Sequence, residues 1–172
     1  EITKVVEPVL QVDGGNIYYI NISQDDFKLG GSSFNQTLNT IGNEAPDVKN
    51  TAFVKETFNT IQNLIQKDAI TAGHDIASGG LITTLLEMCF ADVNLGANFD
   101  ISSLNEEDTI KVLFAENSGI VFQADASVEA ILSAQNIEFF TIGTANNSGI
   151  VSIKNKEDFI SLEVSEMRDV WY

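Results

Sequence analysis

The chain has 172 residues, of which 44% are hydrophobic and 20% are charged. A chain of this length normally forms one domain with a full hydrophobic core, and we expect a single domain over residues 1–172. Its 25 acidic and 9 basic residues give a formal net charge of −16, which repels phosphate backbones and anionic lipid and argues against nucleic-acid or membrane-surface binding.

The first half of the chain predicts two strands and three helices. Alternating β-branched and aromatic side chains are typical of a strand, and apolar side chains three or four positions apart are typical of an amphipathic helix. The clearest helix covers residues 51–66, and the helix after it is apolar nearly all round, so we expect it to be buried. In chain order the elements are a strand at 16–22, a helix at 33–41, a helix at 51–66, a strand at 69–73 and a helix at 81–91.

The second half predicts four strands, near 98–101, 119–124, 138–143 and 149–154, and a helix at 127–135. Ser127 is the expected N-cap of that helix. Interleaved strands and helices predict an α/β (α+β) layered domain in which helices cover a mixed sheet. Residues 167–172 have the pattern of an amphipathic helix that has been cut off, so we expect a fragment of a larger polypeptide.

The single cysteine and the lengths of the apolar runs exclude several classes of protein. Cys89 has no second cysteine to pair with, which excludes an intrachain disulfide and a Cys-based zinc site. It lies in the apolar run 85–90, where a buried thiol is expected rather than a nucleophile. No apolar run reaches the roughly 18 residues of a membrane span, and we expect a cytoplasmic protein.

Residues 73–81, Gly-His-Asp-Ile-Ala-Ser-Gly-Gly-Leu, are the most informative segment, because they lie between a predicted strand and a buried helix. Ligands collect at such turns, where paired glycines let the backbone approach a phosphate and the helix directs N–H groups at the anion. Asp75, at the strand end, is positioned like a Mg²⁺ ligand shared with nucleotide phosphates. The alternative is a plain helix start, with Ser78-Gly79-Gly80 as a cap and tight turn. The segment matches neither a Walker loop nor the dinucleotide fingerprint.

Two other segments are weaker candidates for a ligand site. Leu29-Gly30-Gly31-Ser32-Ser33 is a second glycine pair before a predicted helix, in which Phe34, Leu38 and Ile41 would share one face. Glu116 lies in the turn 113–119, where it could line a cleft or be an ordinary turn acid.

The remaining polar features are interpreted as structural. His74, the only histidine, could be a general base, but a structural histidine at a strand end is preferred. The acidic runs Asp25-Asp26 and Glu106-Glu107-Asp108 are interpreted as solvated faces or first-turn acids and not as catalytic pairs.

The two glycine-containing segments and the turn at Glu116, in their order along the chain, resemble the C-terminal domain of the aminoimidazole ribonucleotide (AIR) synthetase superfamily. More narrowly, they are similar to the second copy of that domain in the long, single-chain phosphoribosylformylglycinamidine synthases. The resemblance extends from about Val5 over nearly the whole chain. It is carried by Leu29-Gly30-Gly31-Ser32, Gly42-Asn43-Glu44-Ala45-Pro46-Asp47-Val48, His74-Asp75 with Ser78-Gly79-Gly80-Leu81, Leu86-Glu87-Met88-Cys89-Phe90-Ala91 and Leu113-Phe114-Ala115-Glu116-Asn117-Ser118-Gly119.

The resemblance implies an ATP-dependent C–N ligase of purine biosynthesis. Such an enzyme converts formylglycinamide ribonucleotide, ATP and glutamine to the formylglycinamidine, ADP, phosphate and glutamate, with ammonia supplied by a separate glutaminase domain. One copy of the module carries the reaction, and the copy that resembles this chain holds a nucleotide with Mg²⁺ as a structural fixture. The expected partners are the preceding N-terminal half-module and the glutaminase domain of the same parent, and the isolated fragment is expected to be inactive.

The family pattern His-Asp-Arg-Ser-Asp-Gly-Gly carries over by position. Its magnesium-binding Asp corresponds to Asp75. Ala77 stands where the family has a nucleotide-contacting Ser, and Ser78 stands where it has an Asp, while Ile76 replaces an Arg. The resemblance therefore implies a cofactor-binding turn made of Ala77, Ser78, Gly79 and Gly80. Its departures from the family pattern suit a nucleotide site that is kept for structure and not for catalytic turnover.

Two alternatives stay open. The first is a superfamily member with another substrate: AIR synthetase, selenophosphate synthetase, thiamine-monophosphate kinase or a hydrogenase maturation factor. The second is a non-catalytic scaffold domain. Residues 42–47, Gly-Asn-Glu-Ala-Pro-Asp, favour the synthase over the first alternative.

Overall fold

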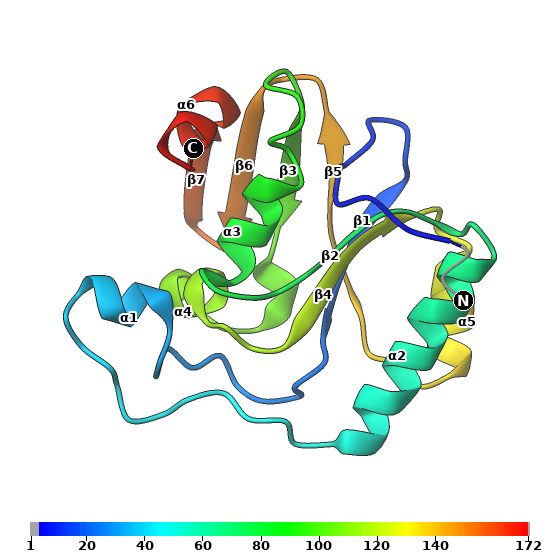
Figure 1. Ribbon diagram of the computed structural model, residues 1–172, viewed down its shortest axis with the longest axis horizontal. Coiled ribbons are helices and arrows are strands. Elements are labelled where there is room, and N and C mark those ends of the chain that lie inside the picture. Colours follow the sequence, from blue (N-terminus) through cyan, green and yellow to red (C-terminus); the bar gives the residue numbers. More distant parts are fainter. Residues whose placement is uncertain (1–3, 172) are drawn as a thin grey trace.

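The computed structural model describes residues 4–171 and has one mixed seven-stranded sheet at its centre, with strand order β2-β4-β1-β5-β3-β6-β7 (Figure 1). Strands β3 and β6 are parallel, and the other neighbouring pairs are antiparallel. The strands are β1 (Asn16–Asn21), β2 (Ile70–Asp75), β3 (Gly96–Asp100), β4 (Gly119–Ala124), β5 (Phe140–Asn146), β6 (Ile150–Asn155) and β7 (Asp158–Glu163). The helices are α1 (Ser33–Thr37), α2 (Thr51–Gln66), α3 (Gly80–Glu87), α4 (Thr109–Phe114), α5 (Val128–Ala134) and α6 (Val164–Trp171), with a 3₁₀ turn at Ser102–Leu104.

The central strand β1 shows how the sheet is covered on both faces. Its side chains alternate, with Ile17 and Tyr19 in one hydrophobic cluster and Tyr18 and Ile20 in the other, and none is more than 1% exposed. Helices α3, α4 and α6 pack on the first cluster, while α2 and α5 pack on the second (Figure 1). The layered α/β architecture with a mixed sheet is therefore confirmed.

Several elements match their predicted bounds, whereas the first helix does not. Helix α2 and strand β4 have the predicted bounds. The predicted helix at 33–41 is wrong in length, because α1 ends at Thr37 and Asn39 turns the chain with φ +55°. Leu38 and Ile41 are 57% and 75% exposed, so they do not form the expected apolar face.

Strand β7, helix α4 and the 3₁₀ turn at Ser102–Leu104 were not predicted, and the predicted helices at 81–91 and 127–135 differ in detail. Strand β7 is an edge strand with mostly exposed or half-exposed side chains, and α4 has only six residues. Helix α3 ends at Glu87 instead of residue 91. Ser127 is the N-cap of α5, but its side chain caps no amide; Ser127 N–H donates to Asp125 Oδ1 at 2.9 Å.

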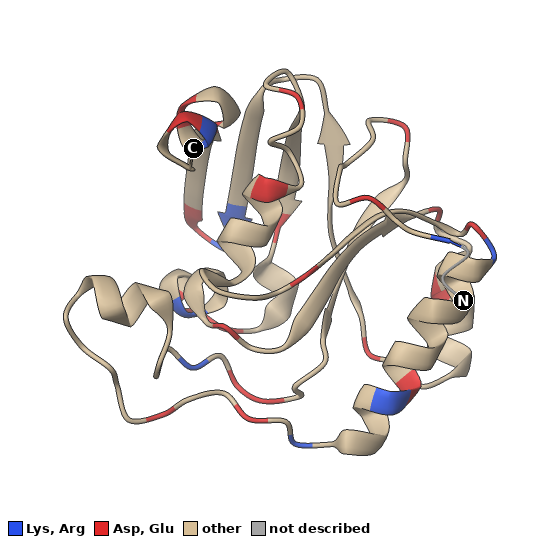
Figure 2. Cartoon of the chain, in the orientation of Figure 1, with Lys and Arg blue, Asp and Glu red and all other residues tan. Residues whose placement is uncertain are grey.

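The expectation for Cys89 agrees with the structure, and a helix is present near the end of the chain, although it begins at Val164 and not at residue 167. Cys89 is fully buried, and burial raises the pKa of its thiol to about 12, as suits a core residue and not a nucleophile. The C-terminal helix exists as α6; Tyr172 lies outside the described residues. Among residues 4–171 no helix has the length and apolar character needed to cross a membrane. Acidic residues lie on loops at both ends of the sheet and on helices (Figure 2).

Asp25 anchors the long connection between β1 and α2, and its interpretation as part of a solvated acidic run is wrong. Its side chain is only 5% exposed and accepts hydrogen bonds from Lys28 Nζ at 2.8 Å and from Asp47 N–H at 2.9 Å. Lys49 Nζ lies 3.4 Å from the same carboxylate. No periodic pattern predicts this contact, because the partners of Asp25 lie in segments without regular secondary structure.

This carboxylate is expected to link folding to pH. Burial alone would raise the pKa of Asp25, but hydrogen bonds from Lys28, Asp47 and Asp26 outweigh burial and lower the pKa from 3.8 to about 2. The folded protein thus binds this proton more weakly than the unfolded chain, so the stabilisation is complete above pH 3.8 and is lost as pH falls towards 2. Urea unfolding at decreasing pH should show the stability difference between wild type and Asp25→Asn shrinking over this interval. A difference that does not change with pH would contradict the assignment.

Candidate functional site

The segment 75–80 leaves the edge of the sheet at the end of β2. Asp75 pairs with Ile120 of β4 and has a side chain that is 81% exposed. Ile76, the next residue, is 8% exposed and belongs to the core, which explains why an apolar residue stands at this position. Ala77 and Ser78 are exposed, and Gly80 N–H donates to Ala77 O at 3.1 Å, which closes the turn into α3.

His74 makes contacts that suit a structural role. Its Nδ1 lies 2.7 Å from Asp75 O, and its Nε2 lies 3.3 Å from Glu87 Oε2 at the end of α3. Both ring nitrogens therefore face oxygen atoms of the chain itself, and the ring connects the end of β2 to α3.

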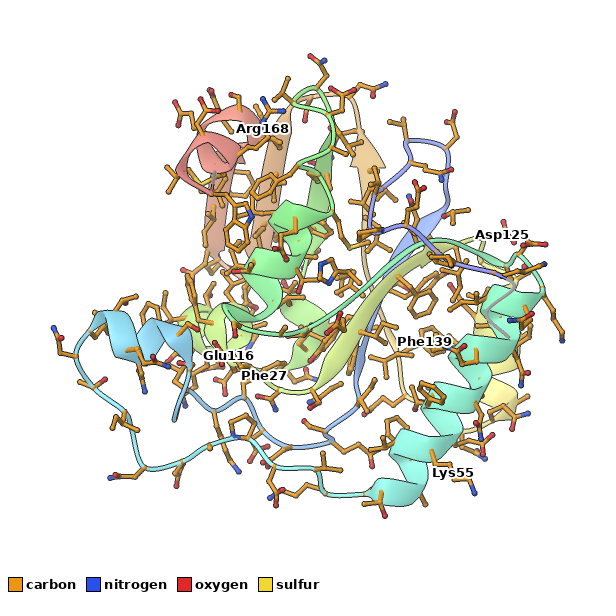
Figure 3. The ribbon with its side chains drawn as sticks, in the orientation of Figure 1. Phe27, Lys55, Glu116, Asp125, Phe139 and Arg168 are labelled. Atoms are coloured by element: carbon orange, nitrogen blue, oxygen red, sulfur yellow. The ribbon has the colours of Figure 1, made fainter. Side chains whose placement is uncertain are left out.

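Glu116 brings the three candidate segments of the sequence together. Glu116 is labelled in Figure 3, near α1 and α4. Its Oε1 accepts one hydrogen bond from Gly79 N–H and one from Ser33 N–H, each at 2.8 Å. Burial would raise the pKa of this carboxyl, but the two N–H donors outweigh burial and hold the pKa below its ordinary value. Both glycine turns and the turn before β4 thus converge on one carboxylate oxygen.

Backbone conformation and close packing explain why glycine occupies positions 79 and 80. Gly79 and Gly80 have φ values of +91° and +74°, in the left-handed region that favours glycine. A Cβ on Gly80 would lie 2.7 Å from Leu113 O and 2.9 Å from Ala115 O, at the end of α4. The backbone of the turn therefore approaches other backbone of the same chain closely.

The turn offers one exposed carboxylate to a metal, and the Gly79 amide in it is not free to bind a phosphate. Asp75 offers an exposed carboxylate, a hard oxygen donor of the kind that Mg²⁺ prefers. Within residues 4–171, no group of three or more His, Cys, Asp or Glu side chains is placed to hold a metal ion. Asp75 could therefore supply one ligand, with the others coming from a nucleotide or another domain. The N–H of Gly79 is already bonded to Glu116 and is not available to a phosphate in this arrangement.

Sequence reasoning missed an apolar groove that begins beside Asp75. The groove has a volume of about 530 Å³ and lies between α2 and strands β2 and β4. Phe58 lines it and is 62% exposed, although α2 periodicity places this residue on the apolar face. The apolar face of α2 contains more large side chains than the sheet covers, and this excess was the feature of the sequence that could have indicated the groove. It is lined by Val6, Pro8, Ile22, Val54, Thr57, Phe58, Ile61, Gln62, Ile65, Ile70, Gly73, His74, Asp75, Gly119, Ile120 and Phe122.

Sequence comparisons relate nearly the whole chain to known proteins. A family model described as "AIR synthase related protein, C-terminal domain" matches residues 17–155. A probable phosphoribosylformylglycinamidine synthase, chloroplastic/mitochondrial, of Arabidopsis thaliana is 34% identical over 178 residues, which cover 99% of this chain and 12% of the relative. A probable phosphoribosylformylglycinamidine synthase of Caenorhabditis elegans is 37% identical over 160 residues, covering 84% of this chain and 12% of the relative. The chain thus spans about an eighth of the length of these relatives.

Solved structures share the fold at low sequence identity. T. maritima PurL complexed with ATP has a TM-score of 0.69 and 12% identity, covering 96% of this chain and 27% of that chain. Hydrogenase maturation protein HypE in complex with ATP has a TM-score of 0.57 and 16% identity, covering 92% of this chain and 54% of that chain. At these identities the similarity establishes the fold of the domain.

Proposed function

The chain belongs to the family of AIR synthase related proteins, whose C-terminal domain it matches, and on this premise we propose that it is one domain of a phosphoribosylformylglycinamidine synthase. The observation that carries the proposal is the similarity to the Arabidopsis relative of that name over 99% of the chain. Residues 1–172 form a single domain in this proposal, and its partners are the preceding N-terminal half-module and the glutaminase domain of the same parent.

The intact parent is proposed to be an ATP-dependent C–N ligase, a glutamine amidotransferase of purine biosynthesis. It would make formylglycinamidine ribonucleotide from formylglycinamide ribonucleotide, ATP and glutamine. We expect the domain itself to be inactive alone. A cytoplasmic location also remains a prediction, since the Arabidopsis relative is named as chloroplastic/mitochondrial.

Within the parent, this domain is proposed to complete a structural site for ATP or ADP with Mg²⁺. Asp75 would be the metal ligand, and Ala77, Ser78, Gly79 and Gly80 would form the edge of the nucleotide site. Two observations support this role: the exposed Asp75 carboxylate, and fold relatives solved as complexes with ATP and ADP. A Mg²⁺ ion held there would neutralise phosphate charge that the acidic chain otherwise repels.

The test compares nucleotide protection of the parent polypeptide with and without the Asp75 carboxylate. Mg·ADP should raise the unfolding midpoint of the wild-type parent, and Asp75→Asn should weaken the affinity of this site by about tenfold or more, since one charged metal ligand is lost. Asp13→Asn, which removes an exposed carboxylate from the loop before β1, is the matched control. Equal protection of all three proteins would exclude Asp75 as a ligand, and no protection of any would favour a scaffold domain. Product formation by the 172-residue chain alone would contradict its expected inactivity.

A further inference from the structure

Two backbone N–H groups from distant parts of the chain point at one carboxylate oxygen. Ser33 N–H and Gly79 N–H each lie 2.8 Å from Glu116 Oε1, although these residues are 83 and 37 positions away from Glu116 in the sequence. Converging backbone N–H groups are the arrangement that proteins use to bind phosphate and carboxylate oxygens. The glycine turn therefore does have an anion, and that anion belongs to the chain.

We propose that Glu116 is a positioning residue that acts as the resident anion of the Gly79 turn. Its carboxylate occupies the donors that a phosphate would otherwise use and holds the starts of α1 and α3 together. This proposal rests on the proposed function. It implies that the domain would contact the nucleotide through the metal at Asp75 and that no phosphate binds the Gly79 amide.

The residues on both sides of Glu116 are anchored by burial, hydrogen bonds or ring packing, and this positions the backbone from which the carboxylate extends. Ala115 and Asn117 are 2% and 1% exposed. Asn117 Nδ2 donates to Asp26 O at 3.0 Å and to Ser23 Oγ at 3.1 Å, which ties this turn to the β1–α2 connection. On the other side, the Phe114 ring lies 4.6 Å from the Phe34 ring between centroids.

Electrostatics favour one anion at this position and disfavour a second. A negative charge at the start of α3 interacts favourably with the helix dipole, and α3 has no side-chain cap at Gly79. A phosphate at the same turn would meet the Glu116 carboxylate at close range, in a chain with a net charge of −16. It could bind only by displacing the carboxylate from both N–H groups.

The experiment is chemical rescue of Glu116→Ala in the 172-residue chain. This substitution removes the atoms of one acetate ion and leaves the two N–H donors without their acceptor. The unfolding midpoint should fall by about 5 °C, because charge-assisted hydrogen bonds are lost. Acetate should then raise the midpoint of the variant by at least about 1 °C more than it raises that of wild type, with chloride at equal ionic strength as the control. In ¹H–¹⁵N spectra the Gly79 and Ser33 amide signals should move with acetate only in the variant.

Inorganic phosphate provides the decisive comparison in wild type. It should leave the Gly79 amide signal of wild type unmoved, and a saturable shift of that signal would overturn the proposal. Absence of acetate rescue in a folded Glu116→Ala would also overturn it. If Glu116→Ala does not fold, Glu116→Gln replaces it, because the Gln side chain keeps an acceptor oxygen at the same place. This variant should fold, and its Gly79 amide proton signal should be displaced from the wild-type position. An unchanged signal would count against the contact. None of these measurements uses a nucleotide, so their outcome is independent of the Mg·ADP test on Asp75.

Discussion

Gly80→Ala should lower the free energy of unfolding by about 3–4 kcal/mol. The residue has φ +74°, which costs a side-chain-bearing residue about 1 kcal/mol, and the added Cβ would lie 2.7 Å from Leu113 O and 2.8 Å from Phe114 C. Both contacts are with backbone at the end of α4, which cannot rotate away as a flexible side chain can. Urea denaturation of the 172-residue chain measures the loss.

Gly31→Ala is the matched control, since it separates backbone conformation from steric contact. Gly31 has φ +77°, nearly the same as Gly80, but a Cβ there would have nothing within 4 Å. This variant should therefore lose only about 1 kcal/mol. Equal losses at the two positions would show that close approach to α4 is not what requires glycine at Gly80.

Asp25→Ala should lower the free energy of unfolding by about 1–2 kcal/mol, because Lys28 Nζ and the Asp47 N–H lose a common acceptor that is only 5% exposed, while the lysine side chains are 22% and 46% exposed and stay partly solvated. The substitution would leave Lys28 Nζ without its acceptor and would free the N–H of Asp47. The segment between β1 and α2 would lose its main polar anchor, and chemical denaturation with an independent probe of that segment should report the change.

Asp26→Ala is the control for Asp25, because it removes an identical charge from the next position. Asp26 is exposed, and surface substitutions of this kind change stability by less than about 0.5 kcal/mol. If the two alanine variants were equally stable, the net charge and not the buried contact would determine the effect.

Secondary structure could be predicted wherever one physical signal extended over several residues. The 16 residues of α2 and the alternating pattern of β1 are such signals, and both elements were found where the pattern placed them. The helix beginning at Ser33 was predicted too long because Leu38 and Ile41 have helical spacing, whereas a single left-handed residue, Asn39, ends the helix earlier.

The candidate site could be predicted only in parts. The two glycine turns and the turn at Glu116 were each recognised from local composition, but their meeting depends on contacts across up to 83 positions, which no local pattern encodes. Similarly, nothing in the sequence distinguishes Asp25 from Asp26, although one is buried and the other is exposed. Burial of an isolated acid is decided by tertiary structure.

The strand order has a consequence for how the chain acquires its structure. Of the six neighbouring strand pairs, only β6 and β7 follow one another in sequence. Strand β1 pairs with β4 and β5, so that Asn16 lies opposite Ala124 and Thr144, residues made more than a hundred positions later. Such high contact order predicts slow folding, with loop closure preceding most of the stabilising contacts. During synthesis on the ribosome, the apolar side chains of β1 therefore stay exposed until most of the domain, including β4 and β5, has been made.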